Sequence, residues 1–300
     1  MFRRGGTLLS AENKAMKIML TGGRGMLGRT LTSVLKTSHE VLVTDYPEAD
    51  ITDYFSISRA VSCCCPDVVI HCAAKTQVDN CETEIVSAYN LNAYGAANVA
   101  RACFEHSVKL IAISTDYVFS GENPGHAWQE DDIATGGNTV YGQSKFLGEK
   151  MIMGLCPDAL ICRLAWLYGA GGPSFVHSIL KLADGSRPQL KVVNDQIGNP
   201  TSCLAVAKHM RILIEHPELK GICHLTCEGE ASWYDFAREI CRITGVNQDI
   251  VPCSTAEFPR PAPRPAFSCL DNTMLRKHDL PPMPHWKKAL ENFFIRGFIW

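Results

Sequence analysis

The chain lacks several features that mark particular classes of protein. Its 300 residues carry 29 Lys and Arg against 31 Asp and Glu, a net charge of -2. It therefore has no charge excess that would attract nucleic acid or an anionic membrane surface. We find no internal repeat, no low-complexity tract and no apolar run of membrane-spanning length. The composition is ordinary for a soluble globular protein. Any anionic ligand must therefore be held by local donors.

The fourteen cysteines include no C-x-x-C pair. Cys63–Cys65 are consecutive, and consecutive thiols cannot all be bridged sensibly. We therefore expect free, mostly buried thiols in a reducing, cytoplasmic compartment. The segment Cys223–Cys227 with its histidine could form the corner of a metal site, but its apolar neighbours favour a strand. No metal is expected.

The two ends of the chain differ from the rest. Residues 1–15 carry basic residues and glycines but no apolar core, unlike a secretory signal or a membrane span. We expect them to form a disordered N-terminal extension. The last eight residues, 293–300, are apolar but too short to span a bilayer, and we expect them to cover an apolar groove.

From Met16 onwards, short β-branched runs alternate with helical stretches, the pattern of a parallel sheet with crossover helices. Strands are expected at Lys17–Thr21, Glu40–Asp45, Asp67–Ala73, Lys109–Ser114 and Ala159–Leu164. Helices are expected at Met26–Leu35, Tyr54–Ser62, Glu84–His106 and Tyr141–Leu155. Several strands are apolar throughout, which indicates burial on both faces. The predicted fold is α/β, a Rossmann-type doubly wound parallel sheet.

After about residue 165 the pattern changes to glycine clusters, the polar stretch Asn194–Ser202 and the proline-rich stretch Phe258–Pro265. These indicate a smaller, loop-rich C-terminal α/β lobe. Its helices are expected at Phe175–Ala183, Cys203–Glu215, Ser232–Thr244 and Trp286–Arg296. We therefore assign residues 16–165 to a dinucleotide-binding domain. Residues 166–300 are assigned mainly to a substrate-binding lobe, with part of the chain returning to the first domain.

The segment TGGRGMLG follows the first expected strand and opens the first expected helix, the setting that a dinucleotide fingerprint requires. Gly22 permits a tight turn, Gly25 lets the backbone approach a pyrophosphate, and Gly28 lets helix and strand pack closely. Met26 and Leu27 lie inside the motif and are expected to line the same site. Free N–H groups at the helix start then favour the phosphates.

Asp45 ends the second expected strand, where an acidic residue accepts hydrogen bonds from the adenosine ribose and favours NADH. Arg24 could offset its repulsion of a 2′-phosphate, so NADPH remains open. The alternative role for Asp45 is a turn or cap residue. Further cofactor contacts are expected beside the adenine and at the end of the third strand: Asp50, Ile51, Cys72, Ala73 and Ala74.

Tyr141 and Lys145 stand four residues apart in an expected helix, so both can face one site. A nearby ammonium lowers a phenol pKa, and Tyr141 could then pass a proton to a carbonyl oxygen as hydride arrives at its carbon. The Y-x-x-x-K spacing also occurs by chance in helices. Thr115 follows a strand expected to end at Ser114, where open α/β sheets place their chemistry, and its hydroxyl could bond the same substrate oxygen.

Several motifs occur in the order seen in one family: Thr-Asp-Tyr-Val-Phe from Thr115, Val-Tyr-Gly-x-x-Lys to Lys145, Arg163–Tyr168, Asn194–Thr201 and Pro261–Pro265. In this, the chain resembles the dTDP-4-dehydrorhamnose reductases, extended short-chain dehydrogenases, over roughly residues 16–296. The resemblance implies a Rossmann domain, a small sugar-binding lobe, and NAD(P)H-dependent reduction of dTDP-4-keto-rhamnose to dTDP-rhamnose. It makes Thr115, Tyr141 and Lys145 the catalytic residues. It places the following residues against the sugar nucleotide: Thr76, Val78, Asp79, Thr115, Tyr117, Trp166 and Arg264.

Arg264 is the expected partner of the substrate diphosphate, because a nearly neutral chain still has to hold a dianion. Flanking prolines restrict its backbone, although Arg260 could do the same work and Arg264 could be a solvated loop residue. Two departures from the family appear. Lys75 replaces a histidine found in some relatives, and Thr30 replaces the acidic residue of a metal-bridged dimer, so monomer and homodimer both stay open.

Three other functions share this fold or resemblance. A 4,6-dehydratase typically has Thr-Asp-Glu where this chain has Tyr117 at the third position, and a phenol is a poor replacement for that carboxylate. An epimerase fits the motifs after residue 165 less well than a reductase does. A non-catalytic subunit resembling the methionine adenosyltransferase β subunit would keep the fold without the chemistry. The tryptophans Trp128, Trp233 and Trp300 are expected to be packing or surface residues.

Overall fold

The computed structural model describes residues 15–295. The expected N-terminal extension, apart from Ala15, and the end of the apolar tail with Trp300 lie outside the described residues. A six-stranded parallel sheet forms the centre, in the order β10-β5-β4-β3-β1-β2. Its strands are β1 (Lys17–Thr21), β2 (Glu40–Thr44), β3 (Val68–His71), β4 (Lys109–Thr115), β5 (Leu160–Leu164) and β10 (Gly221–His224). The predicted fold class is confirmed.

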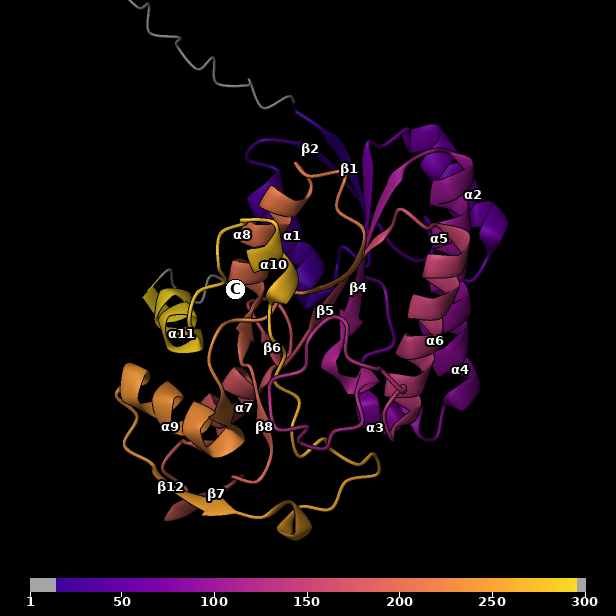
Figure 1. Cartoon of the computed structure of the whole chain (residues 1–300). Coiled ribbons are helices and arrows are strands. Elements are labelled where there is room, and N and C mark those ends of the chain that lie inside the picture. Colours follow the sequence, from indigo (N-terminus) through magenta and orange to yellow (C-terminus); the bar gives the residue numbers. More distant parts are fainter. Residues whose placement is uncertain (1–14, 296–300) are drawn as a thin grey trace, which may run out of the picture.

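Helices cover both faces of this sheet (Figure 1). On one face lie α2 (Tyr54–Cys64), α4 (Ile85–Tyr89), α5 (Ala96–Glu105) and α6 (Val140–Leu155). On the other lie α1 (Met26–Leu35) and α8 (Cys203–Leu213), which pack against each other. The side chains of β1 alternate between two cores: Ile18 and Leu20 point to one, and Met19 points to the other. This explains why the strand sequence is apolar throughout.

The single helix expected over Glu84–His106 is wrong in its middle. The chain forms α4, then a π-helical turn η1 (Asn90–Gly95), and then α5. The wider turn directs the Asn92 side chain to the backbone N and O of Lys75, at 2.8 and 3.1 Å. Gly148 of α6 packs on the same turn so closely that a Cβ there would lie 2.2 Å from Asn92 O. Turns of this kind are frequent at functional sites.

The remaining elements lie mostly below the sheet in Figure 1. They are α3 (Val78–Cys81), η2 (Asp116–Val118), β6 (Leu167–Tyr168), α7 (Phe175–Leu182), β7 (Gln189–Val193), β8 (Ile197–Gly198), β9 (Thr201–Ser202), β11 (Ala231–Ser232), α9 (Trp233–Thr244), β12 (Asp249–Cys253), η3 (Thr255–Glu257), α10 (Thr273–Lys277) and α11 (Trp286–Ile295). A capping box between Ser232 and Asp235 starts α9, and Gly245 in the left-handed conformation ends it. Three two-stranded pairings join β7 to β12, β8 to β11 and β6 to β9.

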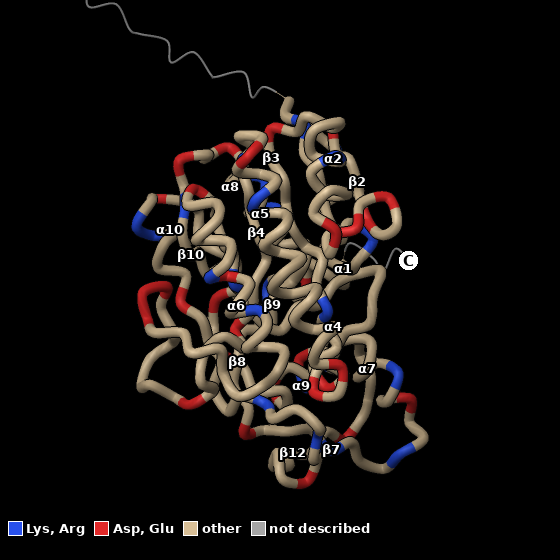
Figure 2. The backbone as a smooth tube through the Cα atoms, turned by 90° about the vertical axis from the view of Figure 1, so that its right-hand side faces the viewer, with Lys and Arg blue, Asp and Glu red and all other residues tan. Residues whose placement is uncertain are grey.

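Two elements beyond residue 165, α8 and β10, belong to the central sheet and its cover. The functions assigned to the two parts of the chain stay predictions. None of the helices in the described part of the chain has both the length and the apolar character to cross a bilayer. Figure 2 shows Lys and Arg interspersed with Asp and Glu along the backbone, in keeping with the nearly balanced charge.

Candidate active site

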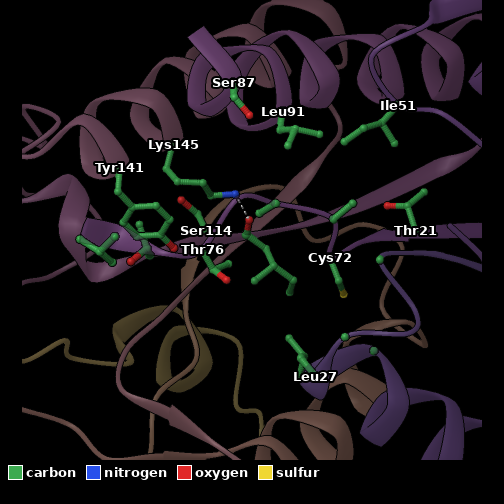
Figure 3. Close-up of a pocket in the computed structure, with 18 of the residues that line it drawn as sticks. Thr21, Leu27, Ile51, Cys72, Thr76, Ser87, Leu91, Ser114, Tyr141 and Lys145 are labelled. Carbon is green, nitrogen blue, oxygen red and sulfur yellow. Dashed lines mark hydrogen bonds between the residues drawn. The ribbon is translucent and has the colours of Figure 1, made fainter. Parts of the chain in front are cut away.

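A cavity of about 1480 Å³ lies at the carboxyl ends of the central strands. Its wall includes the glycine turn after β1, the ends of β2, β3, β4 and β5, and the start of α6. Figure 3 shows Tyr141 and Lys145 reaching into it from one helix, with Leu27 on the opposite side of the view. All the residues predicted to bind the cofactor line this cavity: Gly22, Gly25, Met26, Leu27, Gly28, Asp45, Asp50, Ile51, Cys72, Ala73, Ala74, Tyr141 and Lys145.

The glycine turn has the shape that a pyrophosphate-binding loop requires. Gly22 has φ +70°, and a Cβ there would lie 2.4 Å from the backbone N of Ala73. A Cβ on Gly28 would lie 2.4 Å from Gly22 O, so only glycine allows this helix–strand contact. Gly25 is the N-cap of α1 and supplies no side-chain cap. The first N–H groups of α1 are thus available to phosphate oxygens, and the site fits a dinucleotide.

Asp45 lies beside this turn and is already engaged by it. One carboxylate oxygen accepts a hydrogen bond from the backbone N of Arg24 at 2.7 Å. The Arg24 guanidinium binds Glu48 at 2.6 Å and the Tyr46 carbonyl at 3.3 Å. Asp45 therefore keeps one oxygen for a ribose, while Arg24 would have to exchange its partner to reach a 2′-phosphate.

Tyr141 and Lys145 are placed by the first turns of α6. Thr139 caps this helix by accepting a hydrogen bond from the backbone N of Gly142 at 2.9 Å. The Lys145 ammonium donates to the carbonyl oxygen of Ile113 in β4 at 2.7 Å, the dashed line of Figure 3. Burial lowers the pKa of Lys145 to about 8, and the carboxylate of Glu149 acts in the opposite direction.

The expected lowering of the Tyr141 pKa by Lys145 is wrong for this structure. Burial raises the pKa of Tyr141 well above its ordinary value, and a hydrogen bond with Thr115 only partly opposes that rise. The ammonium is directed to the Ile113 carbonyl, so its effect on the phenol does not exceed the cost of desolvating a phenolate. Tyr141 is consequently a protonated hydroxyl at neutral pH.

Thr115, at the end of β4, is joined by a residue that we did not predict. Its hydroxyl donates to Asp116 at 3.0 Å and accepts from the backbone N of Tyr117 at 3.3 Å. The second carboxylate oxygen of Asp116 is buried and accepts no well-formed hydrogen bond from the described residues, and the Ser268 side chain only partly offsets the cost of burying the charge. Burial raises the pKa of Asp116 to about 6. The signal for this residue was present in the sequence, since Asp116 directly follows Thr115 in the same motif.

Four residues for which substrate contacts were predicted also line this cavity: Thr76, Val78, Tyr117 and Trp166. Their contact with a substrate stays a prediction. The Trp166 backbone has φ +46°, and its ring stacks on Trp233 at 3.4 Å between centroids. The Trp233 indole donates to Gln196 at 3.0 Å. Trp233 is thus a packing residue, as expected, and the ring on which it packs belongs to the cavity wall.

Two predicted substrate residues, Asp79 and Arg264, do not line the cavity. They form a salt bridge with each other at 2.9 Å, and Arg264 also donates to the Ala262 carbonyl at 2.8 Å. Arg260 is exposed. Other wall residues that the sequence did not reveal come from α4 and η1, including Ser87, Asn90 and Leu91. They were hidden because a regular helix was expected there.

Within residues 15–295, no group of three or more His, Cys, Asp or Glu side chains is arranged to hold a metal ion. All fourteen cysteines are free thiols. Cys223 and His224 lie in β10, the strand expected around them.

Comparison with known proteins places the chain in a family. Residues 16–297 match the model of the RmlD substrate binding domain. A spore coat polysaccharide biosynthesis protein of Bacillus subtilis is 37% identical over 278 residues, covering 92% of this chain and 96% of that protein. A dTDP-4-dehydrorhamnose reductase of Mycolicibacterium smegmatis is 37% identical over 281 residues, covering 93% of this chain and 85% of that protein.

Solved structures of similar sequence indicate the same family. A dTDP-4-dehydrorhamnose reductase of Clostridium acetobutylicum is 40% identical with a TM-score of 0.89, covering 94% of this chain and 99% of that one. The enzyme of that name from Bacillus anthracis, solved in complex with NADP, is 36% identical with a TM-score of 0.90, covering 94% of this chain and 100% of that one. A UDP-glucose 4-epimerase of Thermus thermophilus, at 19% identity and a TM-score of 0.80 over 94% of this chain and 99% of that one, shares the fold.

Proposed function

The chain belongs to the RmlD substrate binding domain family, and from this premise we propose that it is an NAD(P)H-dependent reductase of a nucleotide-linked 4-keto-6-deoxy sugar. The proposed reaction converts dTDP-4-dehydrorhamnose to dTDP-rhamnose. One observation carries the proposal. Thr115, Tyr141 and Lys145 line the same cavity as the glycine turn after β1, so a proton donor stands beside a dinucleotide cradle.

NADPH or NADH is the proposed cofactor. Gly22, Gly25 and Gly28 would let its pyrophosphate approach the start of α1, and Asp45 would bind its ribose through the free carboxylate oxygen. When bound, the reduced nicotinamide supplies a hydride to the keto carbon. The small residues that follow β3, Ala73 and Ala74, leave room beside the turn.

Tyr141 is the proposed donor of the proton that the keto oxygen gains. Its raised pKa keeps the hydroxyl protonated at neutral pH. The Thr115 hydroxyl, which donates to Asp116 in this structure, would turn its hydrogen to the keto oxygen and hold that oxygen beside Tyr141. The positive charge of Lys145, one helical turn further along α6, favours the phenolate that proton transfer leaves. Solvent then returns the proton.

The sugar nucleotide would occupy the end of the cavity near Trp166. Thr76, Val78 and Tyr117 are proposed to contact the sugar, since they line the same cavity as Trp166. Arg264 is proposed to bind the diphosphate with guanidinium donors that the Asp79 carboxylate does not occupy. On this proposal Asp79 acts by orienting Arg264 as well as by contacting the ligand.

We also propose a cytoplasmic location, supported by fourteen free thiols, which persist in a reducing compartment. The protein is proposed to work as a monomer or a homodimer. Residues 16–165 are proposed to hold mainly the cofactor and residues 166–300 mainly the sugar nucleotide.

The test is to mix the protein with a dTDP-4-keto-6-deoxy sugar and either NADPH or NADH. Absorbance of the reduced nicotinamide should fall, and the product should carry a hydroxyl at carbon 4. Oxidation of the nicotinamide that proceeds equally without the sugar would contradict the proposal. So would cofactor binding with no turnover, especially if the protein co-purified with a synthetase subunit.

A further inference from the structure

A buried ion pair joins α6, the helix that carries Tyr141 and Lys145, to the neighbouring strand β5. Arg163 of β5 donates to both carboxylate oxygens of Glu149 in α6, at 2.9 and 2.8 Å. Their side chains are only 4% and 2% exposed. A buried pair is costly to desolvate and is often no more stabilising than well-packed apolar residues. Stability alone therefore does not account for its place in the fold.

The carboxylate also binds the strand that carries Thr115. The hydroxyl of Ser114 donates to Glu149 at 2.5 Å. Ser114 and Arg163 are register partners on the neighbouring strands β4 and β5, so Glu149 spans both strand ends. One turn earlier on α6, Lys145 donates to Ile113, the residue before Ser114. The helix is thus bonded to two consecutive residues of β4, immediately before Thr115.

From this geometry we propose that Glu149, clamped by Arg163 and Ser114, is a positioning residue that holds α6 over the end of β4 and keeps the Lys145 ammonium charged. The proposal rests on the reductase function only where it concerns turnover. Glu149 does not line the cavity, so it acts through Lys145 and Ser114, both of which do.

The surroundings of Lys145 explain why one carboxylate matters. The ionisable groups around it are His71 at the end of β3, Cys72 directly after that strand, and Tyr141 and Glu149 of α6. Arg163 is paired with Glu149. Burial lowers the pKa of His71 to about 3 and raises the pKa of Cys72 to about 12, so both are neutral at pH 7.

Two described side chains act on the pKa of Lys145: the Cys72 thiol, which is neutral, and the Glu149 carboxylate. Its charge raises a pKa that burial has already lowered to about 8. Loss of Glu149 should therefore lower the pKa of Lys145 further and leave a neutral amine at the pH where the site works.

If the Glu149–Arg163 pair only stabilised the fold, removing both charges should leave the pKa of Lys145 unchanged. A double variant therefore distinguishes a structural role from the proposed effect on Lys145. Glu149→Gln alone leaves Arg163 buried without a partner and is expected to destabilise the fold. Glu149→Gln combined with Arg163→Gln removes both charges and keeps polar groups for hydrogen bonding. Stability should recover in the double variant, whereas Lys145 still lacks the carboxylate.

The primary measurement needs neither cofactor nor sugar. Protein carrying ¹³C,¹⁵N-lysine is titrated by NMR, and the Lys145 signal is assigned by its absence in Lys145→Met. We expect the pKa of Lys145 in the double variant to fall by about one unit or more below that of the wild type. The matched control is Glu239→Gln, which breaks the ion pair with Arg242 on α9 and should leave the Lys145 titration unchanged.

Turnover supplies the second measurement. The alkaline limb of the kcat profile with the sugar nucleotide should move to lower pH by the same amount in the double variant. A wild-type pKa for Lys145 in a folded double variant would overturn the proposal. If the wild type turns over no sugar nucleotide, the reductase function fails, but the NMR titration still decides the role of Glu149.

Discussion

Replacing Asp116 by asparagine should stabilise the protein at neutral pH, because burial of its carboxylate costs more than the hydrogen bonds from Ser268 and Thr115 offset. Burial raises the pKa of Asp116 from 3.8 to about 6. Because the folded-state pKa of Asp116 is raised, its contribution to the free energy of unfolding is most favourable below pH 4, where the carboxyl is protonated in both states. That contribution is lost as the pH rises through 6. The shift of about two units corresponds to about 3 kcal/mol of destabilisation at pH 7.5, of which about 1 kcal/mol is already present at pH 4.5.

The assay is urea unfolding of wild type and Asp116→Asn at pH 4.5 and 7.5. The advantage of the variant should be about 2 kcal/mol larger at pH 7.5 than at pH 4.5. Other acidic groups titrate in both proteins and cancel in this comparison. Asp184→Asn is the control: hydrogen bonds from Ser186 lower the pKa of Asp184, so its titration window lies below pH 4 and its effect should stay nearly constant. An Asp116→Asn advantage that is equal at both pH values would refute the reasoning.

Four further predictions concern the site. Tyr141→Phe should reduce turnover by about 10²-fold or more with cofactor affinity nearly intact, and near-normal turnover would remove this hydroxyl from the mechanism; exposed Tyr94 supplies the matched Phe control. Asp45→Ala should shift the ratio of kcat/KM values towards NADPH by relieving repulsion of a 2′-phosphate, and an unchanged ratio would show that Asp45 does not face the ribose. Arg264→Ala should raise KM for the sugar nucleotide several-fold and leave KM for the cofactor unchanged; equal sugar kinetics would leave the diphosphate site unassigned. Gly28→Ala should weaken cofactor binding in a fluorescence titration, because its Cβ would lie 2.4 Å from Gly22 O, and unaltered affinity would show that the turn can shift freely.

Periodicity and motif order were sufficient for much of this protein. The five strands expected before residue 165 all form, with ends that differ by no more than two residues from β1 to β5. Buried parallel strands are uniformly apolar and are bounded by turn residues, so each is recognisable locally. The glycine turn was equally recognisable, because its strand–turn–helix setting is contained in one short segment. The sequence did not reveal the surroundings that raise the pKa of Tyr141. It also did not reveal that the Lys145 ammonium donates to the carbonyl oxygen of Ile113.

What the sequence by itself determined is therefore local: the alternation of strands and helices, the glycine turn, and the presence of Thr115, Tyr141 and Lys145. Only the tertiary structure decided that Asp79 and Arg264 face each other and that Glu149 joins β4 to β5. It also decided that residues 90–95 form a π turn, since the close approach of Gly148 comes from a distant helix. The physical reason is the same in each case. A pKa, an ion pair or a widened turn depends on groups that are far apart in the chain and are brought together only by packing.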